Sequence, residues 1–233
     1  MPGMPQGHRW AKLAIAAVFI AGVLAFFALG GQRYLSLDAI KGNRDALLAF
    51  TNAHYVQALL LAFVVYTTAT AFSIPSAIVL SLVLGFLFGR WVGTALIVIA
   101  ATLGATILFL AARYVFKDAA RRRLGEAGEK INEGFARHAF SWMLFLRLTP
   151  LFPFFLVNLA PALTDIPVRT YVLATFIGIL PGTFVFANLG QTLGRIESTR
   201  QLLSPEALIA LALLGLVALV PVIVKRYRAK GRS

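Results

Sequence analysis

The chain contains no cysteine and few acidic residues. The lack of cysteine excludes disulfide bonds, thiolate metal sites and cysteine nucleophiles. Its 233 residues include nine aspartates and glutamates against 22 lysines and arginines, which gives a formal net charge of +13. The basic residues lie between apolar runs and are not interleaved with aromatic residues. Membrane topology therefore explains the charge, and we expect no nucleic-acid partner.

Motifs for catalysis and cofactor binding are missing as well. The sequence has no nucleotide-binding loop and no Ser/His/Asp constellation, and His54 and His138 have no second ligand at metal spacing. We therefore expect a protein that is not an enzyme and that uses neither a cofactor nor a metal ion.

Long apolar runs take up most of the chain. Its residues are 59% hydrophobic, whereas soluble domains are about 45–50% apolar. A helix of about 20 apolar residues crosses a ~30 Å hydrocarbon core. Full spans are predicted at 11–31, within an N-terminal transmembrane segment 1–31, and at 91–112, 170–193 and 207–224. The first run is longer than the apolar part of a secretory signal, which favours a retained span over cleavage near Gly30.

Two segments fit neither a span nor a loop. Residues 56–89 carry no charge, but one helix of that length would measure about 51 Å. Pro75 interrupts it, and the piece that follows, 77–88, would be only about 18 Å long. Residues 140–164 are likewise divided by Pro150 and Pro153. A re-entrant helical hairpin, which enters and leaves the membrane on the same side, accounts for each segment.

The basic residues predict how these segments are oriented. Four spans and two hairpins place both termini and the 113–138 loop on one side, which carries 14 basic residues against six on the other. The richer side is cytoplasmic by the positive-inside rule. We therefore predict a cytoplasmic basic loop with an amphipathic helix at 113–138 and an extracytoplasmic interfacial segment at 32–55. Residues 194–233 are predicted to hold the helix 207–224 and a basic cytoplasmic tail.

A shift of 78 residues relates the two halves of the core, residues 56–193. It places Pro75 on Pro153 and Gly104 on Gly182. Inverted repeats with broken helices near the midplane are typical of secondary transporters. The predicted fold is an all-α polytopic helical bundle with two oppositely oriented re-entrant hairpins in an inverted repeat. Close helix packing is expected at Gly85, Gly89, Gly104 and Gly182, and a kink at Pro181-Gly182.

Five features of residues 60–195 form a specific set: GFLFG (85–89), ARY (112–114), RLTPLFPF (147–154), Asn158 and IGILPGT (177–183). Together they resemble the DedA superfamily, most closely its SNARE-associated Golgi protein branch, whose members carry a VTT domain. The resemblance implies two opposed re-entrant hairpins and movement of lipids between leaflets, undecaprenyl phosphate in bacteria and phospholipids in eukaryotic relatives. Better-studied bacterial members have carboxylates in the first hairpin that are linked to proton use. This chain has no acid between Asp45 and Asp118, so the resemblance does not carry proton coupling over to it.

Arg147 is the strongest candidate for a binding residue. Inserting an arginine near the centre of a membrane helix costs about 2.5–3.5 kcal/mol, so such residues usually face a cavity or a partner. Arg147 either offers its guanidinium to a phosphate in bidentate fashion, caps carbonyls freed by Pro150 and Pro153, or reaches the membrane interface. A structural role is favoured for Asn158 in the hairpin backbone and for Arg113 at a helix C-terminus. The complete set of substrate-binding candidates is Arg147, Asn158, Thr149, Ser73, Ser76 and Arg113.

Three classes of function remain open. The favoured class is a translocase that moves a lipid or lipid phosphate through a midplane site between the two hairpins. The others are a transporter of small ions or solutes and a membrane-organising protein that transports nothing. For the first class we expect membrane lipids, anionic or phosphate-bearing, as partners. We also expect a multi-pass protein of the plasma (inner) membrane with cytoplasmic termini.

Overall fold

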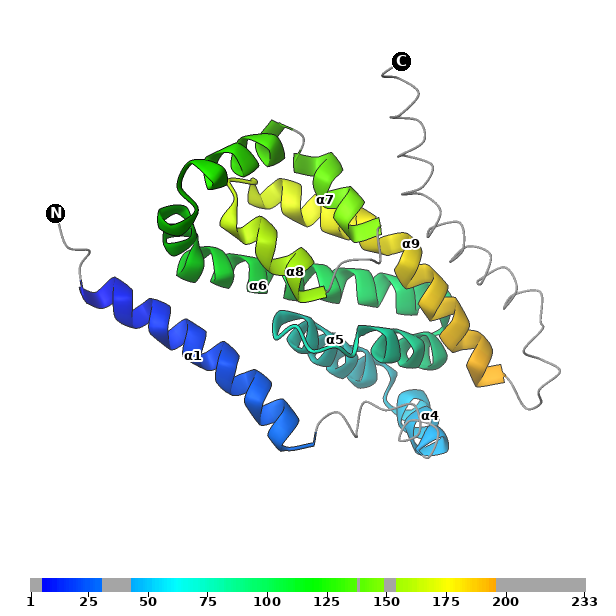
Figure 1. The fold of residues 1–233 in the computed structure, drawn as a ribbon. Helices are drawn as coiled ribbons and strands as arrows, with labels where there is room; N and C mark the ends of the chain where they lie inside the picture. Colours follow the sequence, from blue (N-terminus) through cyan, green and yellow to red (C-terminus); the bar gives the residue numbers. More distant parts are fainter. Residues whose placement is uncertain (1–5, 31–42, 138, 149–153, 196–233) are drawn as a thin grey trace, which may run out of the picture.

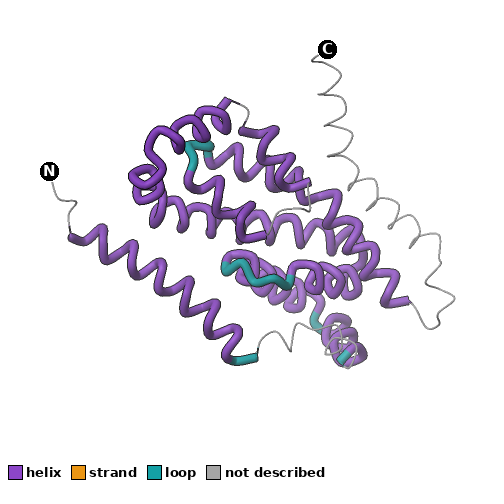
Figure 2. The backbone as a smooth tube through the Cα atoms, viewed as in Figure 1, coloured by secondary structure: helices purple, strands orange, loops and turns teal. Residues whose placement is uncertain are grey.

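The computed structural model describes residues 6–30, 43–137, 139–148 and 154–195, which form helices joined by turns and short links (Figure 1, Figure 2). No strand occurs in these ranges, so the predicted all-α class is confirmed. In chain order the helices are α1 (Gln6–Ala28), α4 (Arg44–Ala53), α5 (Tyr55–Ala71), α6 (Ala77–Arg137), α7 (Ala139–Leu148), α8 (Phe154–Leu159), the 3-10 helix η1 (Ala160–Leu163) and α9 (Val168–Arg195).

Three segments in the described part of the chain are long and apolar enough to cross a membrane. They are Trp10–Ala28 of α1, Ala77–Lys117 of α6 and Val168–Thr192 of α9. These segments contain the span predicted at 91–112 and most of those predicted at 170–193 and 11–31. The chain is therefore a helical membrane protein with several apolar helices. The predicted span 207–224 and residues 32–42 of the interfacial segment lie outside the described residues.

The chain reverses direction within α6, at Gly89. This residue has a φ of +76°, in the left-handed region that glycine adopts without strain. A Cβ added to Gly93 would lie 3.0 Å from the carbonyl oxygen of Leu84, although nine residues of straight helix rise about 13.5 Å. Helix α6 therefore consists of a first arm, 77–88, and a second arm that begins at Arg90. At Gly89 the nearest side chain of another helix is Gln191 of α9, whose Oε1 lies 3.8 Å from the Cβ position. This is an ordinary contact, so the glycine is required by the turn of the chain and not by close packing.

Helix α5 and the first arm of α6 run antiparallel and meet at a tight turn beside Pro75. The end of α5 is a Schellman motif, in which the Ile74 N–H donates to the Ala69 carbonyl over 2.9 Å and the Ser73 N–H donates to the Thr70 carbonyl over 3.0 Å. Ser73 holds the left-handed position of this motif, with a φ of +52°. The chain thus folds back at the proline break that the sequence predicts.

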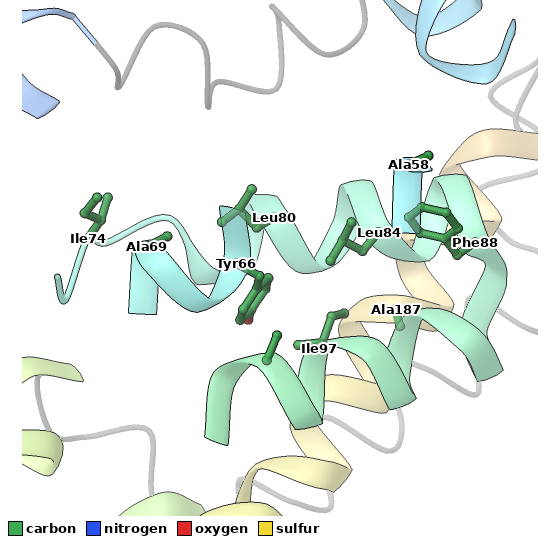
Figure 3. Packing of buried hydrophobic residues seen from close by; sticks show 10 residues of the cluster. Ala58, Tyr66, Ala69, Ile74, Leu80, Leu84, Phe88, Ile97 and Ala187 are labelled. Carbon is green, nitrogen blue, oxygen red and sulfur yellow. The ribbon is translucent and has the colours of Figure 1, made fainter. Parts of the chain in front are cut away.

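A first hydrophobic cluster holds α5, both arms of α6 and α9 together (Figure 3). Tyr66 of α5 lies inside it, 3.1 Å from the hydroxyl of Ser81 on the first arm. Its buried members are Ala58, Tyr66, Ala69, Ile74, Leu80, Leu84, Phe88, Ile97, Ala100 and Ala187. Ala187 comes from α9, so the last described helix closes the bundle over the first hairpin.

A second cluster holds α7, η1 and α9 against the second arm of α6. Its fully buried members include Phe109, Met143, Ala162 and Tyr171. The helix α7 is only 10 residues long, about 15 Å, as predicted for an arm of the second hairpin. Residues 149–153, which contain the predicted breaks at Pro150 and Pro153, lie outside the described residues.

The basic segment predicted at 113–138 is helical as far as Arg137, where α6 ends. The sequence from 113 to 137 contains no proline and is rich in alanine, arginine, lysine and glutamate, which propagate a helix well. The helix predicted within this basic segment is therefore present, but Arg113 does not lie at a helix C-terminus.

Candidate functional site

Arg147 lies in the last turn of α7 and reaches across to α9. Its Nη2 atom donates to the hydroxyl of Tyr171 over 2.9 Å and to the hydroxyl of Thr175 over 3.0 Å. Both partners are neutral. Among the side chains that the structure describes, the acids Asp45 and Asp165 pair with Arg44 and Lys117, and neither pairs with Arg147. The guanidinium thus has hydrogen bonds but no ion-pair partner in this part of the chain.

A glycine on α9 makes the close approach of α7 possible. A Cβ added to Gly178 would lie 2.6 Å from the Cβ of Arg147 and 3.1 Å from its Cγ, which is closer than real Cβ contacts allow. Tyr171, Thr175 and Gly178 are four and three residues apart, so they share one face of α9. On this face, the hydroxyl groups of Tyr171 and Thr175 accept hydrogen bonds from Arg147, and the missing side chain of Gly178 leaves room for the Cβ and Cγ of Arg147.

Tyr171 is fully buried and connects four elements. Its ring stacks on Phe109 of α6 with a centroid distance of 4.0 Å and an interplanar angle of 16°. Its hydroxyl lies 3.2 Å from the carbonyl oxygen of Ala105 on α6 and 3.3 Å from Oδ1 of Asn158 on α8. The same hydroxyl accepts the hydrogen bond from Arg147 of α7. One hydroxyl group therefore links both arms of the second hairpin to α6 and α9.

Two donors at this site are buried without a hydrogen-bond partner in the described structure. They are Nε of Arg147 and Nδ2 of Asn158, and Asn158 is completely inaccessible to solvent. A buried donor without a partner costs about 1–3 kcal/mol, and more when it is charged. Both groups are donors, so a hydrogen-bond acceptor would satisfy them, and a negatively charged acceptor would also supply a counter-charge to the guanidinium.

Arg113 serves a separate place in the fold. Its Nη2 atom donates to the carbonyl oxygens of Thr164 and Ile166 over 2.9 Å and 2.6 Å, in the turn before α9. Its guanidinium also lies over the ring of Phe109, 4.3 Å from the centroid. Since Phe109 stacks on Tyr171, the two aromatic rings separate Arg113 from the site around Arg147. Arg113 anchors the start of α9, and the structure does not bring it together with Arg147.

Three predicted binding residues remain: two lie in the first hairpin, and one lies outside the residues that the structure describes. Ser73 and Ser76 lie in the turn between α5 and α6, and their hydroxyl oxygens are buried without a partner in the described structure. No hydrogen bond joins either one to Arg147 within the described ranges. Thr149 lies outside the described residues.

The two hairpins nevertheless reach the same level of α6. Gly104 packs against Thr67 and Thr70 of the first hairpin. The next residue, Ala105, accepts from Tyr171, which holds the second hairpin.

The predicted glycine contacts are met at two positions. Gly85 lies against the backbone of Ala187 on α9, and Gly104 lies against α5. At Gly182 nothing in the described structure lies within 4 Å of the Cβ position, so the described helices do not make the contact predicted there. Helix α7 ends at Leu148, and its contact with α9 is already made at Gly178, so no part of α7 reaches the next turn. Pro181 lies inside α9, and Figure 1 shows α9 bending part of the way along its length.

No group of three or more histidine, cysteine, aspartate or glutamate side chains is placed to hold a metal ion within the described ranges. The partners of Arg147 on α9 were not predicted from the sequence. A usable signal existed, because a tyrosine, a threonine and a glycine recur at helical spacing in a span without charge. Such a stripe of polar and small residues marks a helix face that packs against another helix.

Comparison with known proteins identifies the family. Residues 74–192 match the VTT domain model. Over 190 residues the chain is 31% identical to the transmembrane protein 41 homolog of Dictyostelium discoideum, covering 80% of this chain and 57% of that protein. It is 27% identical to transmembrane protein 41B of Danio rerio over 189 residues, covering 80% and 67% of the two chains.

The transmembrane protein 41 homolog of Caenorhabditis elegans is 25% identical over 232 residues, covering 94% of each chain. The chain thus spans little more than half of the Dictyostelium protein and nearly all of the Caenorhabditis one. No solved structure matches it. The residues of the VTT match include the whole of the site described above, and the chain belongs to the VTT domain family of the DedA superfamily.

Proposed function

We propose that this protein moves a phosphate-bearing lipid between the two leaflets of a membrane, and that Arg147 binds the phosphate. The observation that carries the proposal is the pair of buried donors without partners, Nε of Arg147 and Nδ2 of Asn158. A phosphate supplies acceptor oxygens to both and a counter-charge to the guanidinium. Charge-assisted hydrogen bonds of this kind are among the strongest in proteins.

The balance of charge favours an anion over a cation. A buried charge without a counter-charge is costly, and a bound anion reduces that cost for Arg147. A cation would meet the positive guanidinium and would find no carboxylate beside it among the described side chains, since Asp165 pairs with Lys117 over 2.6 Å. A transporter of small cations is therefore the weaker alternative. The other alternative, a membrane-organising protein that transports nothing, can be distinguished from the proposal only by an assay of transport.

The lengths of the helices support re-entrant hairpins as part of this proposal. The first arm of α6 has 12 residues between its turns, and α7 has 10 residues. Such helices measure about 18 Å and 15 Å, too short for a ~30 Å hydrocarbon core. The first hairpin would then bring its polar turn, which contains Ser73 and Ser76, into the membrane, where the surrounding helices satisfy its backbone.

An inverted repeat is supported by one matching contact in the two halves. The Thr67 hydroxyl of α5 donates to the carbonyl oxygen of Ala100 over 3.3 Å. In the other half, Arg147 of α7 packs against Gly178, which is Ala100 shifted by 78 residues. In each half, the first helix of the hairpin thus packs on the same position of the span that follows.

We further propose that both termini face the cytoplasm of a cell whose plasma membrane holds the protein. Lys12 of α1 lies over the ring of Tyr114, 5.6 Å from the centroid. The start of α1 is therefore at the same end as the basic segment that begins at Arg113. Basic residues favour the cytoplasmic side.

Reconstitution tests the proposed function. The purified full chain is placed in liposomes that contain a trace of phospholipid with a fluorescent group on its headgroup, and a membrane-impermeant quencher is added outside. We expect the quenched fraction to rise from about half, the share of the outer leaflet, towards completeness. Quenching that stays at the level of protein-free liposomes would contradict the proposal.

The re-entrant position of the first hairpin can be tested by thiol labelling. Ile78 is 57% exposed in the protein itself, so only the bilayer can shield a cysteine placed there. The chain has no native cysteine. We expect Ile78→Cys to react with a bulky, membrane-impermeant maleimide at least tenfold more slowly than Asn52→Cys, an exposed position in α4. Equal rates for the two variants in intact membranes would show that this arm lies in water.

A further inference from the structure

Tyr171 is the residue on which the contacts of the site converge. Its hydroxyl accepts from Nη2 of Arg147 at 2.9 Å and faces the Ala105 carbonyl at 3.2 Å and Oδ1 of Asn158 at 3.3 Å. A hydroxyl group has one proton, so it donates to only one of these two acceptors at a time. The hydroxyl therefore joins the arginine on α7 to whichever of α6 and α8 accepts its proton.

The hydrogen bonds from Arg147 to Tyr171 and Thr175 determine which N–H groups of its guanidinium remain available to a ligand. Arginine has five N–H groups, and the two on Nη2 are directed to Tyr171 and Thr175. Each of the two edges through which a guanidinium binds an anion in bidentate fashion includes Nη2. Both edges are thus partly occupied by protein hydroxyls, and the Nε–H next to Nη2 is buried without a partner.

We propose that Tyr171 is a positioning residue, which holds the Nη2 end of Arg147 so that its Nε–H, together with Nδ2 of Asn158, faces the phosphate of the lipid. The inference rests on the proposed function. It assigns the phosphate to a single N–H of the arginine and to the amide, in place of the bidentate contact expected from the sequence. Thr175 assists by accepting the second N–H of Nη2.

Two substitutions separate the packing of the Tyr171 ring from the hydrogen bond that its hydroxyl group makes to Arg147. The ring packs on Phe109 at 4.0 Å, and Tyr171→Phe keeps this ring while removing only the hydroxyl group. Phe109→Leu is the matched control, since it removes the stacking partner and leaves the hydroxyl group of Tyr171 in place. A purely structural role of Tyr171 would make the two variants behave alike.

The experiment measures the affinity of the purified full chain for dihexanoyl phosphatidic acid, a short-chain phosphate lipid, by titration calorimetry. We expect Tyr171→Phe to weaken binding about tenfold in the wild-type background, which is about 1.4 kcal/mol. In the Arg147→Ala background the same change should have no effect, because the residue that it positions is absent. Phe109→Leu should lower the Tm and leave the affinity within about twofold.

Each outcome decides a separate claim. If Arg147→Ala weakens binding and Tyr171→Phe does not, the positioning role is overturned and the proposed function stands. If Tyr171→Phe weakens binding equally in both backgrounds, its role is structural and the proposal is likewise overturned. If Arg147→Ala leaves binding unchanged, the phosphate site itself is wrong. Should Tyr171→Phe not purify as folded protein, Thr175→Val asks the same question of the other acceptor of Nη2, with the same expected pattern in the two backgrounds.

Discussion

Replacing Arg147 with alanine is expected to reduce lipid translocation in liposomes to the rate of protein-free liposomes, while the protein still inserts and purifies as folded. The substitution removes the only cation placed among Tyr171, Thr175 and Asn158 in the described structure. Each hydrogen bond to a charged group contributes about 1.5–3 kcal/mol, so losing the contact to the phosphate should lower the rate by about 10- to 150-fold.

Arg147→Lys separates charge from geometry. Lysine keeps the positive charge but is a point charge without the planar set of donors that Tyr171 and Thr175 hold. We expect transport well above that of Arg147→Ala and about tenfold below the wild type. The Tm of both variants decides between binding and capping. If Arg147→Ala loses stability and activity together, the arginine supports the broken hairpin and the binding role is wrong.

The second large effect is expected from Gly178→Ala, which adds one methyl group and removes nothing. The new Cβ would lie 2.6 Å from the Cβ of Arg147, so α7 must move away from α9 and carry the guanidinium off its two hydroxyls. Overpacking of this kind typically costs about 1–3 kcal/mol. We expect transport to fall at least tenfold, with a lower Tm.

Gly182→Ala is the matched control for this substitution. The residue lies one turn further along α9, and nothing in the described structure is within 4 Å of its Cβ position. Alanine is about 1 kcal/mol better than glycine inside a helix, so the control should keep its activity and gain stability. Equal loss of transport in the two variants would contradict the claim that α7 and α9 meet at Gly178.

Much of the fold could be predicted from local chemistry. Pro75 ends α5 because proline disfavours helical backbone in the residue before it, and the chain turns there as expected. The charge-free piece after Pro75, residues 77–88, predicts a folded-back pair of helices because it is too short to cross a bilayer alone. Three of the four predicted spans coincide with apolar helices, and the fourth lies outside the described residues.

The sequence could not reveal which helix faces meet. Arg147 and its partners Tyr171 and Thr175 are separated by 24 and 28 residues, and no local pattern fixes that pairing. The 78-residue register predicted equal contacts at Gly104 and Gly182, but among the two only Gly104 has another of the described helices packed against it. The difference arises because α7 is a short arm that ends at Leu148, whereas α5 extends to Ala71 and covers Gly104.

The measurement that tests the account most directly compares two lipids in the same liposomes. One is phosphatidic acid with a fluorescent acyl chain, and the other is a neutral glycolipid with the same acyl chains. A site built around Arg147 and Asn158 predicts that the wild-type protein moves the phosphate lipid at least tenfold faster than the glycolipid, and that Arg147→Ala removes this difference. Equal rates for the two lipids with the wild-type protein would contradict the phosphate site, and would indicate a protein that only disturbs the bilayer.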